Sequence, residues 1–122
     1  MQSDRFRSAA ERKDFSSFEE IFTEDVLFRS PAVFSPYEGR DAVGMVLTAV
    51  ARVFEDFRYT DQVETGDTAI LAFSATVSGR ELDGIDLLRF GTDGKIREMV
   101  VYIRPFSGLT ALAEAMRSTL AP

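Results

Sequence analysis

One acidic residue, Asp86, interrupts an apolar stretch and is the first candidate for chemistry in this chain. Side chains alternate along a strand, so Asp86 shares a face with Gly84, Leu88 and Phe90. A carboxyl group on such a face is either a misfit or the polar anchor of an apolar pocket. We expect Asp86 to point into a pocket and to have a raised pKa, because no Lys or Arg shares its face. The alternatives are a structural acid held by backbone amides and, if the strand phase is off by one residue, an exposed acid.

The composition excludes several kinds of chemistry. The 122 residues include no Cys and no His, which rules out thiolate chemistry and removes both the commonest general base and the commonest metal ligand. We therefore expect no metal and no cofactor. Phe occurs 11 times, against 3 Tyr and no Trp. This bias predicts a core or cavity wall built from aromatic surface with few polar groups.

Charge and hydropathy limit the partners. The net charge of −6, without a basic cluster to offset it, argues against nucleic acid and against an anionic membrane surface. No apolar run approaches the ~18 residues of a membrane span, and the first residues lack the apolar core of a signal peptide. We expect a cytoplasmic protein whose partner is a small apolar molecule.

The order of elements predicts an α+β fold in a single domain, residues 1–122. The expected helices are two short ones, at 3–13 and from about 14, a long one at 41–55 and a C-terminal one at 107–120. The expected strands are 25–30, 57–64, 68–78, 80–90 and 95–104, with a loop at 31–40. The long helix carries apolar residues at helical spacing (Val43, Val46, Leu47, Val50), so it needs a large apolar partner surface, and the sheet supplies it.

Three segments carry a resemblance to a known family. They are EDVLFRSP at 24–31, EGRDAV at the start of the long helix, and IDLLRFGTDGKI at 85–96. With the order of elements, they resemble the nuclear transport factor 2-like (cystatin-like) superfamily. Within it the chain is similar to a SnoaL-like domain and to ketosteroid isomerase in layout. The resemblance implies a cone-shaped, strongly curved antiparallel sheet wrapped around a long helix, an apolar pocket, and a homodimer.

The resemblance also implies which positions would carry activity. Steroid isomerases place a general-base Asp directly before the proline that ends the first strand, where this chain has Ser30. Their oxyanion-binding Tyr corresponds to Phe6, whereas their second oxyanion donor, a protonated Asp, is retained as Asp86. The catalytic Arg, Asp and Asp of limonene-type epoxide hydrolases correspond to Phe73, Ala75 and Val101, which are all apolar. We therefore expect neither activity.

These observations leave three hypotheses open. The first is a small-molecule binding protein whose apolar pocket uses Asp86 as a hydrogen-bond anchor. The second is an isomerase- or cyclase-type enzyme with Asp86 as its acid/base, and the third is a dimeric interaction domain with a collapsed pocket. Tyr37 and Tyr59 are expected to pack in the loop and at the rim, the alternative being that they contribute hydroxyl groups at the cavity mouth. Tyr102, Arg104 and Thr76 are expected to lie at the dimer interface. The expected pocket residues are Phe28, Ser30, Phe73, Asp86, Leu88, Phe90, Met99, Val101 and Ile103.

Overall fold

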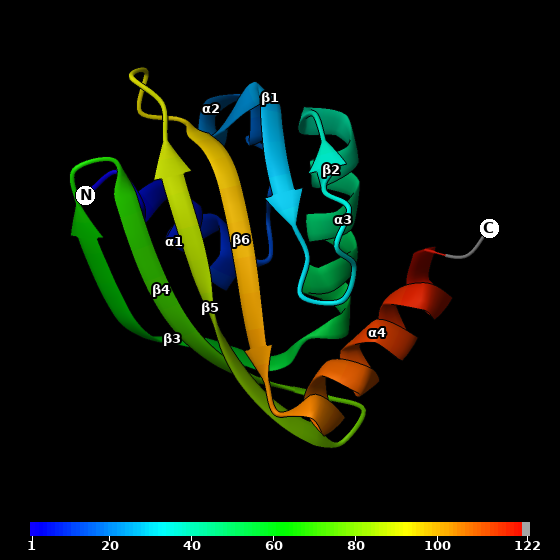
Figure 1. Ribbon diagram of the computed structural model, residues 1–122. Coiled ribbons are helices and arrows are strands. Elements are labelled where there is room, and N and C mark those ends of the chain that lie inside the picture. The colour runs from blue at the N-terminus through cyan, green and yellow to red at the C-terminus, as the bar shows by residue number, and fades with distance from the viewer. Residues whose placement is uncertain (121–122) are drawn as a thin grey trace.

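A curved six-stranded sheet forms one wall of the molecule, and helices cover its inner face (Figure 1). The computed structural model describes residues 1–120. The helices are α1 (Asp4–Arg12), α2 (Phe18–Ile21), α3 (Arg40–Val53) and α4 (Phe106–Leu120). The strands are β1 (Phe22–Arg29), β2 (Tyr37–Glu38), β3 (Glu55–Thr65), β4 (Thr68–Val77), β5 (Arg80–Phe90) and β6 (Ile96–Arg104). The α+β fold predicted from the sequence is confirmed.

The strand order is β2-β1-β6-β5-β4-β3, and every neighbouring pair is antiparallel except β1 with β6. That one parallel pair arises because α3 and the β3–β5 meander separate the two strands in the chain. The register places Asp86 directly between Leu71 of β4 and Val101 of β6. Along β5 Asp86, Leu88 and Phe90 are buried while the intervening residues are half-buried, so the predicted strand phase is confirmed.

Local hydrogen bonds explain where the elements differ from the expected ranges. The second helix begins at Phe18 rather than near 14, because Asp14 accepts the backbone N–H of Ser16 through its side chain and forms a turn there. The loop at 31–40 contains the two-residue strand β2, which pairs with the end of β1. A strand of this length has no periodicity that a sequence could reveal.

The helices close the inner face unevenly. Phe6 of α1 lies against Phe15 and Phe22, with ring centroids 5.9 and 6.2 Å apart, and fills the end of the cone near α2. The buried stripe of α3 (Val43, Val46, Leu47) confirms the predicted inner face of the long helix. Helix α4 leaves the lower end of β6 and crosses the start of β5, where a Cβ on Gly108 would lie 2.7 Å from the Leu82 Cβ. Only a glycine allows that close approach.

Candidate functional site

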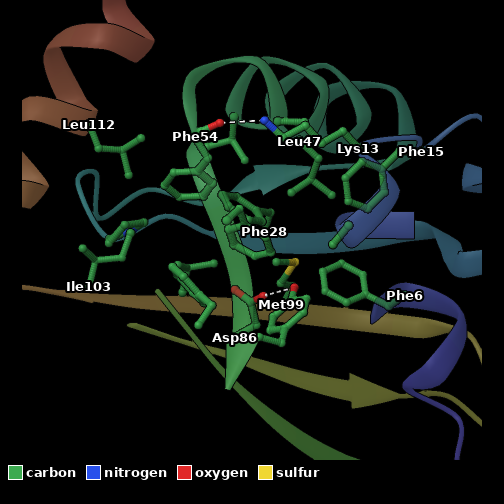
Figure 2. A pocket seen from close by; sticks show the side chains of 18 residues that line it. Phe6, Lys13, Phe15, Phe28, Leu47, Phe54, Asp86, Met99, Ile103 and Leu112 are labelled. Atoms are coloured by element: carbon green, nitrogen blue, oxygen red, sulfur yellow. Dashed lines mark hydrogen bonds between the residues drawn. The ribbon is translucent and has the colours of Figure 1, made fainter. Parts of the chain in front are cut away.

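Asp86 lies on the inner face of the sheet at the floor of an apolar cavity (Figure 2). Its exposed fraction is 4%, and the Tyr59 hydroxyl donates a hydrogen bond to Asp86 Oδ2 at 2.7 Å. No other hydrogen bond to the Asp86 side chain occurs within residues 1–120, and Oδ1 is not among the buried atoms left without a partner. One carboxyl oxygen is therefore fixed by the protein and the other is available to the cavity.

Tyr59 reaches Asp86 across the intervening strand. It pairs with Phe73 of β4, and its ring meets the Phe57 ring edge-on at 4.9 Å and the Phe73 ring at 6.3 Å. On another side the guanidinium carbon of Arg7 lies 5.7 Å from the centre of the ring. These contacts hold the phenol in one orientation, with its hydroxyl directed at the carboxyl group.

Burial controls the protonation of this pair. Desolvation raises the pKa of Asp86 from 3.8 to about 7, and the hydrogen bond from Tyr59 opposes part of that rise. Burial, reinforced by the neighbouring carboxylate, raises the pKa of Tyr59 well above its ordinary value. At neutral pH Tyr59 is thus a hydrogen-bond donor, while Asp86 is present in both its protonated and its ionised form.

The cavity itself is small and mostly apolar, and seven of its eighteen lining residues are aromatic. Its free volume is about 60 Å³, and the hollow reaches about 580 Å³ when its open mouth and the space between the lining atoms are included. Apart from Asp86, Tyr59 and Lys13, its walls carry no titratable side chain. The lining residues are Phe6, Ala10, Lys13, Phe15, Phe28, Pro31, Leu47, Val50, Ala51, Phe54, Phe57, Tyr59, Phe73, Asp86, Met99, Val101, Ile103 and Leu112.

Six of the nine residues predicted to form a pocket line this cavity: Phe28, Phe73, Asp86, Met99, Val101 and Ile103. The other three do not. Ser30 turns its hydroxyl into the following loop, where it accepts the backbone N–H groups of Ala32 and Val33. Leu88 and Phe90 share the face of Asp86 and are buried in the hydrophobic core, but they are not among the residues that line this cavity.

Two polar residues of the cavity, Tyr59 and Lys13, were not among the pocket residues predicted from the sequence. Tyr59 was expected at the rim, but only 8% of it is exposed and it contacts the candidate acid. Its position two residues after Phe57 on one strand was the available signal, since both rings share a face. Lys13, which closes the end of α1, also lines the cavity. Its spacing from Asp86 in the chain gives no sign of this proximity.

The cavity offers no evident metal site and no second carboxyl group. Within residues 1–120 no three acidic side chains gather closely enough to hold a metal ion. Phe6, Phe73 and Val101, which the resemblance aligns with catalytic positions, line the cavity as apolar groups, and Ala75 is buried outside it. In the part of the chain that the structure describes, residues 1–120, no helix is long and apolar enough to cross a membrane.

Comparison with known proteins gives the family. Residues 4–99 match the SnoaL-like domain family, and the chain belongs to it. No curated protein matches the sequence.

Solved structures show how widely the fold is shared. A steroid delta-isomerase from Pseudomonas aeruginosa is 42% identical, with a TM-score of 0.94, over 98% of this chain and 89% of that one. An uncharacterised bacterial protein with a cystatin-like fold from Silicibacter pomeroyi is 31% identical, with a TM-score of 0.92, over 96% of this chain and 83% of that one. A putative SnoaL-like polyketide cyclase from Jannaschia is 12% identical, with a TM-score of 0.74, over 92% and 89% of the two chains. This last likeness shows the fold alone.

Proposed function

We propose that this protein binds a small, flat, mainly apolar molecule through one carbonyl or hydroxyl group held by Asp86. The observation that carries the proposal is the Tyr59–Asp86 pair, which leaves one carboxyl oxygen available at the floor of an apolar cavity. Protonated Asp86 can donate to a carbonyl, and ionised Asp86 can accept from a hydroxyl. Tyr59 supports either state by its hydrogen bond to the other oxygen.

The size of the cavity limits which ligands can bind. Sites for drug-sized molecules usually measure roughly 300–1,000 Å³, whereas the free volume here is about 60 Å³. A single-ring ligand therefore enters only if aromatic side chains move. Phe54 and Phe57 are suited to this, because their nearly parallel rings lie 5.3 Å apart and Phe57 is only half-buried. A planar ligand can replace such ring contacts with its own.

Binding is favoured over catalysis because the cavity lacks a second acid or base. Proton transfer next to a carbonyl needs a base and a separate donor for the developing oxyanion. Asp86 is the sole carboxyl group in the lining, and Ser30 directs its hydroxyl to the loop backbone. Each missing group typically costs ~10²-fold in rate. We therefore expect no appreciable steroid isomerisation or epoxide hydrolysis.

An isomerase- or cyclase-type enzyme is the second candidate, favoured by one specific observation. The pKa of about 7 at Asp86 suits a group that both takes and gives a proton near neutral pH. The similar structure from Pseudomonas aeruginosa is named a steroid delta-isomerase. On this hypothesis Asp86 would be the sole acid/base, and the substrate would have to supply whatever further assistance the reaction needs.

Calorimetric titration with 4-ethylphenol and acetophenone tests the binding proposal. We expect both to bind the native protein and to lose roughly tenfold in affinity in Asp86→Leu, which removes the hydrogen bond but keeps the bulk. Asp83→Leu is the matched control, since Asp83 lies on the same strand, faces outward and contacts Arg104. Absence of binding to the native protein would support the interaction domain with a collapsed pocket.

Turnover assays with a panel of steroids and terpene epoxides separate the two candidate activities. Robust turnover that disappears in Asp86→Leu would overturn the binding proposal in favour of an enzyme. Binding without turnover would support it.

We also propose that the protein forms a homodimer through the outer face of the sheet. The support is apolar surface on that face: Tyr102 is 53% exposed and Ile70 40%. A monomer rarely leaves such a surface uncovered. Arg104 and Thr76 are the further expected contacts. Sedimentation velocity should show a dimer at micromolar concentration that Tyr102→Glu converts to a monomer, and a native monomer would contradict the proposal.

A cytoplasmic location also stays a prediction.

A further inference from the structure

Lys13 places a cationic group at the wall of the otherwise apolar cavity. It follows the last residue of α1, where it adopts a left-handed backbone conformation with φ of 55°. Its ammonium donates a hydrogen bond to the backbone oxygen of Phe54, at the end of α3, over 2.7 Å. The side chain thus spans from one helix to another while the residue stays exposed to solvent.

The ammonium group retains binding capacity. Phe54 satisfies one of its three donors, and among residues 1–120 no carboxylate forms an ion pair with it. Six ion pairs form elsewhere in the described structure, including one at Arg7 of the same helix. An unpaired cation next to an apolar cavity is a suitable partner for a ligand's anionic group.

The positions of Lys13 and Asp86 indicate where the polar groups of a bound ligand would lie. In Figure 2 the Lys13 ammonium lies at one end of the cavity beside Phe54, and Asp86 lies at the opposite end. The aromatic walls lie between them. We propose that Lys13 binds a carboxylate at the outer end of the ligand, so that this protein selects aromatic acids whose inner end carries a carbonyl or hydroxyl group.

This inference rests on the proposed binding function, which it deepens by assigning the ligand class. On this inference Lys13 favours anionic ligands, although the protein as a whole is negatively charged. The protein's net charge of −6 disfavours anions in general. A local cation in the cavity wall therefore discriminates between an acid and its neutral analogue, a difference that can be measured directly.

The test compares 3-(4-hydroxyphenyl)propionate with its methyl ester, which has the same ring and hydroxyl but no charge. In the native protein we expect the acid to bind about fivefold more tightly, the upper end of what exposed ion pairs contribute. Lys13→Met keeps the length of the side chain and should abolish the preference without weakening the ester. Lys13→Arg should restore it.

Lys95→Met is the matched control. It removes the same charge as Lys13→Met, but from the other lysine of the chain, which lies in the β5–β6 hairpin and does not line the cavity. The preference should persist in this variant and should shrink as salt screens the ion pair. Equal affinities of acid and ester in the native protein, with ester binding still dependent on Asp86, would overturn the inference and leave the binding function intact. Failure of both ligands to bind would overturn the binding function, and this inference with it.

Discussion

The inner face of β5 and β6 passes through two different environments within a few residues. Near the hairpin, Leu88 and Ile96 are almost completely buried in the hydrophobic core and do not line the cavity. Two residues earlier, at Asp86, the same face opens into the cavity. The burial pattern along β5 does not change between the two regions, so the alternation of the strand does not itself show where the core ends and the cavity begins.

This difference explains why a carboxyl group is tolerated at Asp86. In the filled region an acid would have no partner and no room for one. At the cavity Asp86 has Tyr59 on one oxygen and open space at the other. Burying the ionised carboxyl group costs free energy, and this cost raises the pKa of Asp86. The first and largest prediction follows from the raised pKa.

Stability should fall as pH rises through the titration range of Asp86. Its pKa is about 7 in the folded protein against 3.8 as an ordinary Asp, so the folded state binds the proton more tightly. The stabilisation is fully present below pH 3.8, is lost progressively above it and is gone beyond about pH 7. The total is on the order of 4 kcal/mol. Urea unfolding of the native protein and Asp86→Asn, at several pH values, measures it.

Asp86→Asn cannot ionise and so removes only this contribution, whereas every other titrating group remains in both proteins. Parallel pH dependence of the two proteins between pH 4 and 7 would show that Asp86 is not desolvated as described.

The sequence predicts features that are set within one helix or strand better than features that depend on contacts between distant parts of the chain. The alternation along β5 placed Asp86 on the inner face, and the helical spacing in α3 gave its buried side, because both patterns are set within one element. Leu88 shares that face without lining the cavity, and the alternation along the strand cannot distinguish the two cases because it reports only which face a side chain occupies. The Tyr59–Asp86 bond was missed for a related reason, since a side chain that reaches across a strand leaves no pattern along it.

Truncating a leucine in each region sharpens the comparison. Leu88→Ala should destabilise the protein by about 4 kcal/mol, since the filled region leaves a cavity that cannot collapse. Leu112→Ala, on α4, should cost about 2 kcal/mol, because Leu112 already borders open space on one side. Urea unfolding measures both. Equal losses would indicate that the cavity is closed in solution and that both leucines belong to one continuous core.

Removal of the Tyr59 hydroxyl is expected to have the smallest effect on stability. Tyr59→Phe keeps the ring contacts with Phe57 and Phe73 but deletes one buried hydrogen bond, which is worth about 1 kcal/mol. Because that bond lowers the pKa of Asp86, its loss should raise the pKa above about 7. Tyr37→Phe is the control, as the hydroxyl of Tyr37 has no described bond to Asp86. An unchanged Asp86 pKa in Tyr59→Phe would contradict the pairing.

Titration of the Asp86 carboxyl carbon by NMR, with and without acetophenone, tests the central claim most directly. Acetophenone can only accept a hydrogen bond, so it binds the protonated form of Asp86 in preference. We predict a pKa of about 7 in the free protein and a higher pKa when acetophenone is bound. A pKa near 3.8, or one near 7 that saturating acetophenone leaves unchanged, would contradict a ligand cavity anchored by Asp86.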